Sequence, residues 1–231
     1  MFYSNVTGLP VYSKLEVSIR RETAVCVTGH REKLIAPYRN DPDMLGITRT
    51  AVKLMLERYI DIVMDKGYTT LISGLAEGTD LWAADHAIAR KRFAPECKLI
   101  GIMPYLKHAN GFSAENTELL KHVERHADLL ITTCDNRNMV YGKTAGYNAD
   151  PHVYRNRNFF MVDNSAAVIA FHSEASVHSG TGQTVRYAER RGKPIFSFGI
   201  DDVYNVIDNV GTDKAAIFEA LKSIKLSVPK P

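Results

Sequence analysis

The sequence predicts an α/β fold in which one parallel sheet carries helices on both faces. Three observations lead to this prediction. Short runs of apolar and β-branched residues alternate with longer amphipathic stretches along the chain. The apolar runs are continuous, as in strands that are buried on both faces. Glycine-containing turns follow several of these runs, where a parallel strand is followed by a helix.

The strands and helices are placed by these patterns in turn. The expected strands span Thr23–Thr28, Thr69–Ser73, Lys98–Met103, Ala127–Thr132, Ala166–Phe171 and Pro194–Ser197. The expected helices span Ile47–Lys66, Thr79–Arg92, Ser113–His126, Asn156–Asn164, Gly182–Arg191 and Asp213–Ile224. This order predicts a single Rossmann-like domain over residues 23–231, preceded by an N-terminal extension, residues 1–22.

Ligands of such sheets bind beyond the carboxyl ends of the strands. We therefore expect the site to be built from segments that follow strands, namely Thr28–Arg31, Ser73–Asp80, Met103–Tyr105, Thr132–Asn138 and Phe171–Gly182. The polar stretch Cys134–Val153 is expected to form a long loop or flap near it.

Composition excludes several classes of protein. No run of about 18 apolar residues predicts a membrane span, and residues 1–20 lack the pattern of a signal peptide. Three widely spaced cysteines argue against disulfides and a zinc site, which suggests the cytoplasm. A formal net charge of +3 does not by itself predict nucleic-acid binding. We expect no metal and no cofactor, and interpret His122 and His126 as part of an exposed helix face.

The turn Ser73–Asp80 is the first candidate for ligand binding. Its glycines let the backbone turn sharply, and the amides of the following helix are expected to point toward a phosphate. The candidate ligand-binding residues of this turn are Ser73, Gly74, Ala76, Gly78 and Thr79. The alternative is a tight structural turn in which Asp80 caps the helix. The spacing matches neither a dinucleotide fingerprint nor a P-loop.

Three further segments are expected to lie at the same site. Thr28, Gly29, His30 and Arg31 end the first strand, and the planar guanidinium of Arg31 suits phosphate; a solvated turn is the alternative. A second glycine turn contributes Ser179, Gly180 and Thr181. Tyr154, Arg157 and Asn158 precede or begin a helix, where cations oppose the helix dipole and so suggest another use.

The segments TGHR, GLAEGTD, YRNRNFFMVDNSA and SGTGQTV together resemble the SLOG superfamily, which includes the DNA-processing Smf proteins and the LOG phosphoribohydrolases. The resemblance extends over roughly Thr23 to Phe198 and is greatest to the YpsA/YoqJ-type branch. It implies a Rossmann-like sheet that binds a nucleotide, with a homodimer as a reasonable expectation. The site residues that it implies are Gly29, Arg31, Gly74, Glu77, Gly78, Asp80, Arg157, Asn158, Ser179, Gly180 and Thr181.

One departure from the enzymatic branch bears on catalysis. LOG-type enzymes carry a glutamate three residues after the threonine of the glycine loop, and this chain has Thr184 there. A neutral hydroxyl cannot stabilise an oxocarbenium-like centre as a carboxylate does. Glu77 or Asp80 is the candidate catalytic carboxylate in its place.

Three functions remain under consideration. The first is a protein that senses or sequesters a nucleotide, such as an ADP-ribose-type or cyclic-nucleotide signal. The second is an N-glycosidase or phosphoribohydrolase that acts on nucleotides. The third is single-stranded DNA binding, which ranks last because the charges are spread along the chain and form no long basic groove. We therefore expect the partner to be a small nucleotide, and we expect binding neither to a membrane nor to DNA.

Overall fold

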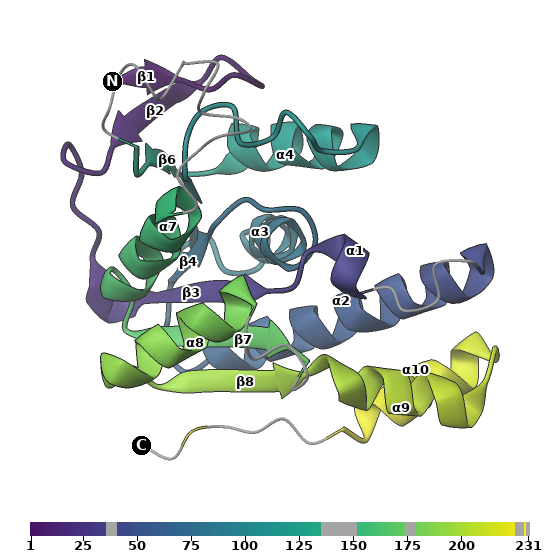
Figure 1. Ribbon diagram of the computed structural model, residues 1–231. Coiled ribbons are helices and arrows are strands. Elements are labelled where there is room, and N and C mark those ends of the chain that lie inside the picture. Colours follow the sequence, from purple (N-terminus) through teal and green to yellow (C-terminus); the bar gives the residue numbers. More distant parts are fainter. Residues whose placement is uncertain (36–40, 135–151, 174–178, 225–228, 230–231) are drawn as a thin grey trace.

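The computed structural model of the chain describes residues 1–35, 41–134, 152–173, 179–224 and 229 (Figure 1). The strands are β1 (Phe2–Tyr3), β2 (Pro10–Ser13), β3 (Ala24–Gly29), β4 (Thr70–Ser73), β5 (Lys98–Met103), β6 (Leu129–Thr132), β7 (Ala167–His172) and β8 (Ile195–Gly199). The helices are α1 (Glu32–Ile35), α2 (Pro42–Met64), α3 (Thr79–Arg90), α4 (Ala114–His126), α7 (His152–Asp163), α8 (Gly180–Arg190), α9 (Ile200–Val210) and α10 (Lys214–Lys222), with a 3-10 turn η1 over Arg21–Thr23.

The strands form one sheet of order β1-β2-β6-β5-β4-β3-β7-β8. Every pairing is parallel except that of β1 with β2. From β3 the chain proceeds through β4, β5 and β6 to one side, and then returns to add β7 and β8 on the other side. The strand order therefore reverses between β3 and β7, and a crevice opens at such a switch point beyond the carboxyl ends of the strands. The expected α/β, Rossmann-like fold is confirmed.

Alternate residues of the strands build two apolar layers, one on each face of the sheet. In β3, Val25 and Val27 belong to the larger layer, which includes apolar residues of α2, α3, α4, α9 and α10. Ala24 and Cys26 point to the other face, where Met161 of α7 and residues of α8 cover them. Figure 1 shows α9 and α10 beside α2, next to the end of β8. No helix of the described residues is long and apolar enough to cross a membrane.

Three helices begin earlier than expected. α2 begins at Pro42 because the carboxylate of Asp41 caps it, accepting from the amides of Asp43 and Met44 at 3.0 and 3.2 Å. α8 begins at Gly180, with Ser179 as its N-cap. α7 begins at His152, so the segment Tyr154–Asn158 lies inside this helix rather than at its start.

The segment before Thr23 contributes β1 and β2 to the same sheet, because β2 pairs with β6. Buried Glu124 of α4 fixes this segment through short hydrogen bonds from the hydroxyls of Ser4 and Thr7, at 2.6 and 2.5 Å. The helices α1 and α9 were likewise not expected. The expected flap over Cys134–Val153 lies almost entirely outside the described residues.

Candidate functional site

A pocket of about 190 Å³ lies at the switch point, where β3 and β7 end. Twelve of the expected site residues line it: Thr28, Gly29, His30, Arg31, Ala76, Asp80, Tyr154, Arg157, Asn158, Ser179, Gly180 and Thr181. Leu34 of α1 also lines it and was not expected. The five other candidates, Ser73, Gly74, Glu77, Gly78 and Thr79, are not lining residues. Of the wider segments, Met103–Tyr105 does not line the pocket, and 135–138 and 174–178 lie outside the described residues.

His30, after the end of β3, connects two strands. Its buried Nε2 accepts a hydrogen bond from the amide of Ser173, beyond the end of β7, at 3.0 Å. Burial, with the neighbouring His172, lowers the pKa of His30. The imidazole is therefore neutral near pH 7, and it holds the two strand ends together instead of supplying positive charge.

The glycine turn after β4 forms a wall of the pocket. Gly78 has φ +85°, and a Cβ there would lie 2.4 Å from the amide nitrogen of Glu32. The amide and hydroxyl of Thr79 both donate to the carbonyl of His30, at 3.3 and 3.0 Å. The amide of Leu81 donates to the carbonyl of Ala76 at 3.1 Å. The amides of Thr79 and Leu81 are thus occupied by protein carbonyls and are not free to bind a phosphate.

Asp80 and Arg157 form a buried ion pair at the base of the pocket. Nη1 of Arg157 lies 3.3 Å from Oδ2 of Asp80 and also donates to the carbonyl of Gly74. Burial raises the pKa of Asp80, and the charge of Arg157 opposes this shift. The pair brings α7 against the glycine turn, which explains why a cation stands in the first half of that helix.

Arg31 and Tyr154 form another part of the pocket wall. The guanidinium of Arg31 lies 5.7 Å from the centroid of the Tyr154 ring, within the range of a cation–π contact. The Tyr154 hydroxyl lies 2.8 Å from that of buried Tyr105, in the loop after β5. Tyr105, from the expected segment Met103–Tyr105, therefore supports the pocket from behind without lining it.

The first turn of α8 leaves its amides available. Oγ of Ser179 accepts from the amide of Gly182 at 3.1 Å. The amides of Gly180 and Thr181 have no hydrogen-bond acceptor among the described residues. Because the helix dipole adds partial positive charge here, this turn is suited to bind an anion.

Thr184 occupies the position at which the enzymatic relatives are expected to carry glutamate. It is buried, donates to the carbonyl of Gly180 at 2.8 Å and accepts from Nδ2 of Asn158 at 2.9 Å. It is not among the residues that line the pocket. Thr184 therefore connects α7 to α8 and offers no group to a ligand.

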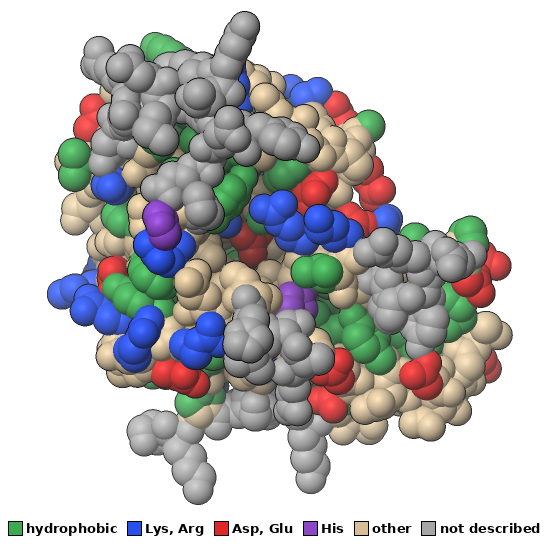
Figure 2. Space-filling view, viewed as in Figure 1, with side chains coloured by type: hydrophobic (Ala, Val, Ile, Leu, Met, Phe, Trp, Pro, Cys, Tyr) green, Lys and Arg blue, Asp and Glu red, His purple; other side chains and the backbone are tan. Residues whose placement is uncertain are grey.

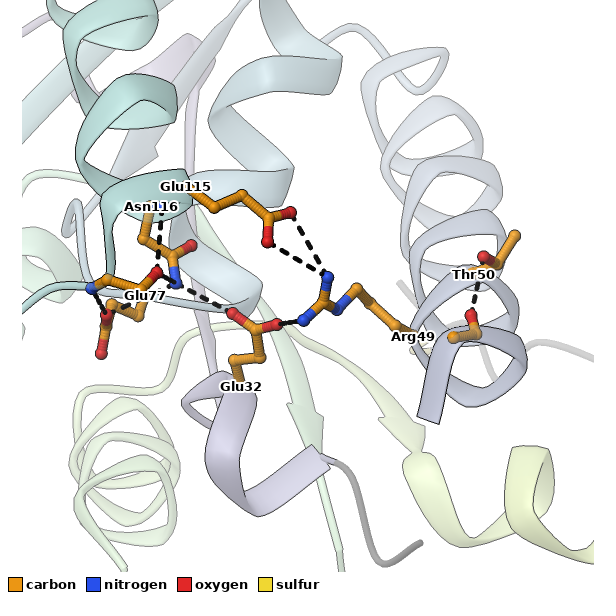
Figure 3. Close-up of polar contacts among 8 residues, drawn as sticks. Glu32, Arg49, Thr50, Glu77, Glu115 and Asn116 are labelled. Atoms are coloured by element: carbon orange, nitrogen blue, oxygen red, sulfur yellow. Dashed lines mark hydrogen bonds and ion pairs between the residues drawn. The ribbon is translucent and has the colours of Figure 1, made fainter. Parts of the chain in front are cut away.

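Glu77 does not line the pocket, and its carboxylate lies beside Asn116 of α4 (Figure 3). Its Oε1 accepts from the amide of Ser113 at 3.1 Å and from Nδ2 of Asn116 at 3.4 Å. Of the two candidate catalytic carboxylates, only Asp80 therefore lines the pocket. Among the described residues no cluster has the composition of a metal site. The rings of His122 and His126 on α4 lie 4.4 Å apart, centroid to centroid, and are tilted, and Nε2 of His122 lies 3.6 Å from Oδ1 of Asp85.

The order and spacing of these motifs can now be compared with known proteins. The family model of the YspA SLOG family matches residues 25–203. The chain belongs to the YspA SLOG family. A UPF0398 protein of Bacillus velezensis is 25% identical over 189 residues, which are 80% of this chain and 95% of the relative. The UPF0398 protein YpsA of Bacillus subtilis is 23% identical over 182 residues, or 78% of this chain and 93% of the relative.

The match confirms the YpsA-type branch of the SLOG family that the four motifs predicted. It begins at residue 25, in β3, and ends at residue 203, in α9. The pocket lies wholly inside it, whereas β1, β2 and α10 lie outside. The site is thus built from the part of the chain that the SLOG family model covers.

Acid is expected to destabilise the protein through His108, in the loop after β5. Burial and the charge of Arg157 lower the pKa of His108 to about 4. The unfolded chain, with a histidine pKa near 6.5, binds a proton in this range and the folded chain does not, so stability falls from about pH 6.5 to about pH 4.

Urea denaturation at several pH values measures this contribution as a difference between two proteins. His108→Asn keeps a donor for the carbonyl of Tyr105 and removes the titration. Between pH 6.5 and pH 4, the free energy of unfolding of the wild type should fall by up to about 3 kcal/mol more than that of the variant. Equal losses in the two proteins would contradict the assignment.

Proposed function

We propose that this protein binds a nucleotide or nucleotide derivative and senses or sequesters it. The phosphate lies at the first turn of α8, against the amides of Gly180 and Thr181 and the guanidinium of Arg31. The observation that carries the proposal is this combination of unoccupied helix amides with a nearby arginine, in a pocket at the switch point. Figure 2 shows further Lys and Arg side chains on this face, over α7 and α8.

The charges of the pocket favour a ligand with a small negative charge. Arg157 is neutralised by Asp80, whereas none of the ion pairs of the described residues involves Arg31. Arg31 and the α8 dipole together supply roughly 1.5 positive charges. One phosphate monoester or diester balances that charge, and a triphosphate does not.

The size of the pocket indicates which part of the ligand it encloses. Its volume of about 190 Å³ is smaller than the ~300–1,000 Å³ that is common for small-molecule sites. It accommodates a phosphate and a sugar, and the base extends beyond it. Leu34, whose side chain is more than half exposed, provides apolar surface for the base at the rim.

Binding without hydrolysis is the function that the carboxylates favour. Glu77 is bound to α4, Thr184 replaces the expected glutamate, and Asp80 is paired with Arg157. N-glycoside hydrolysis remains the second candidate on one observation, since Asp80 does line the pocket. Incubating a bound nucleotide with the protein and assaying for free base separates the two, because only an enzyme releases base.

Replacing Arg31 tests the proposal. A thermal-shift screen with AMP, NAD, ADP-ribose and cyclic AMP should raise the melting temperature with at least one of them. Arg31→Met should then lower the affinity for that ligand by about 10- to 100-fold, because a charge-assisted hydrogen bond contributes about 1.5–3 kcal/mol.

The matched control is Arg125→Met, which removes the same charge from the exposed end of α4. It should leave affinity within about twofold, since surface charges act weakly at this distance. Equal effects of the two variants would mean that only net charge matters. No thermal shift with any of the four compounds would contradict the proposal itself.

A further inference from the structure

A polar cluster behind the pocket joins three elements that are far apart in the sequence (Figure 3). Nδ2 of Asn116, on α4, donates to Oε2 of Glu32 on α1 at 2.9 Å. The same nitrogen lies 3.0 Å from Oγ of Ser113, the N-cap of α4, and 3.4 Å from Oε1 of Glu77, in the glycine turn before α3. One side-chain amide thus lies between two carboxylates.

Both carboxylates directly follow residues that line the pocket. Glu32 follows Arg31, and Glu77 follows Ala76. Each of these residue pairs has one member in the pocket wall and the other bound to Asn116. Asn116 is 5% exposed, so it lies inside the protein, behind the wall, and does not reach the ligand space.

The two carboxylates differ in how else they are held. Glu32 pairs with Arg49 of α2, which also bonds to Glu115 of α4 at 3.3 Å. Glu77 pairs with no cation among the described residues; its donors there are the amide of Ser113 and Asn116. The carboxylate of the glycine turn is therefore held by α4, whereas the carboxylate of α1 is also held by Arg49 of α2.

The two loops also contact each other through their backbones. A Cβ on Gly78 would lie 2.4 Å from the amide nitrogen of Glu32 and 2.9 Å from the carbonyl carbon of Arg31. Since no side chain separates the loops there, a shift of the turn that contains Glu77 displaces the backbone of Arg31.

We infer that Asn116 is a positioning residue that sets the relative placement of the two pocket loops. One hydrogen of its Nδ2 goes to Glu32, and the other is shared between Oγ of Ser113 and Glu77. Glu77 accordingly has a structural role in place of the catalytic one considered from the sequence. The effect on nucleotide affinity rests on the proposed function, whereas the effect on the loops does not.

The test reverses the donor and the acceptor. Asn116→Asp places a third carboxylate between two others, and repulsion should separate the loops. Adding Glu77→Gln should restore the contact with the glycine turn, because the side-chain amide introduced at position 77 then donates to the new carboxylate while its oxygen accepts from the amide of Ser113. It should not restore the contact with Glu32, which still faces the new carboxylate. Glu77→Gln alone should be nearly silent, because one oxygen accepts both bonds in the wild type.

Hydrogen exchange in segments 28–35 and 74–81, measured without ligand, reports the loops directly. Asn116→Asp should accelerate exchange in both segments about tenfold or more. The double variant should return segment 74–81 to within about threefold of the wild type, whereas segment 28–35 stays faster because Glu32 still faces the new carboxylate. Glu77→Ala, which removes the acceptor by a smaller change, should accelerate both segments as well. Glu118→Gln, which changes an exposed carboxylate of α4 paired with Lys121, is the control and should change neither.

Nucleotide affinity, measured with whichever of the four compounds binds, should fall in the variants whose loops exchange faster. Unchanged exchange in Asn116→Asp and Glu77→Ala would overturn the inference, and so would a double variant in which segment 74–81 exchanges no more slowly than in Asn116→Asp. If the wild type binds none of the compounds, the proposed function fails, and the exchange data still decide the role of Asn116.

Discussion

Replacing Arg157 with methionine is expected to lower the free energy of unfolding by about 3–5 kcal/mol. The substitution leaves the carboxylate of Asp80 buried without its cation, and it removes the donor to the carbonyl of Gly74. A buried charge without a partner is among the few causes of effects this large. Urea denaturation monitored by circular dichroism measures the loss.

A second substitution separates the charge from the packing. In the Arg157→Met background, Asp80→Asn removes the unpaired charge and should recover about 1–3 kcal/mol, the range for relieving an unsatisfied buried group. If Arg157→Met alone lowers the free energy of unfolding by less than about 1 kcal/mol, the ion pair is not buried in solution.

Replacing Gly78 with alanine is expected to cost about 3 kcal/mol, the second large effect. Gly78 has φ +85°, where an L-residue is strained by on the order of 1–3 kcal/mol, and the added Cβ would lie 2.4 Å from a backbone nitrogen. Because that nitrogen belongs to Glu32, the loop that carries Arg31 must move. Thermal denaturation should show the loss, with a parallel loss of nucleotide affinity.

Gly111→Ala is the matched control for this prediction. Gly111 also lies in a loop, but its φ is outside the left-handed region and a Cβ there meets no atom within 4 Å. It should be neutral or stabilise the protein by up to about 1 kcal/mol, through the smaller entropy of the unfolded chain. Equal losses at the two positions would indicate that the contact between the loops is not present.

The sequence predicted the sheet because its central strands are buried on both faces and therefore read as continuous apolar runs. It did not reveal β1 (Phe2–Tyr3) and β2 (Pro10–Ser13), because strands of two and four residues are too short to show a hydrophobic period in the sequence. Their pairing depends on tertiary contacts, including the bonds from Ser4 to Glu124. The start of α2 did have a signal, the Asp41-Pro42 cap, which outweighs the later start of its apolar face.

The place of the site could be predicted, and the direction of its side chains could not. Topology alone brings the ends of β3 and β7 together. Which way Glu77 points depends on a turn in which buried Leu75 has φ +58°, a conformation that no local pattern indicates for leucine. The ion pair of Arg157 with Asp80 likewise joins residues 77 positions apart.

The central claim is that a nucleotide phosphate binds at the first turn of α8. Titration of ¹⁵N-labelled protein with AMP, NAD, ADP-ribose and cyclic AMP, followed by backbone amide resonances, tests it most directly. We expect at least one compound to saturate and to shift the resonances of Gly180 and Thr181 most, with smaller shifts at Leu81, whose amide already donates to the carbonyl of Ala76. Saturation without shifts at Gly180 and Thr181, or no saturation with any compound, would contradict it.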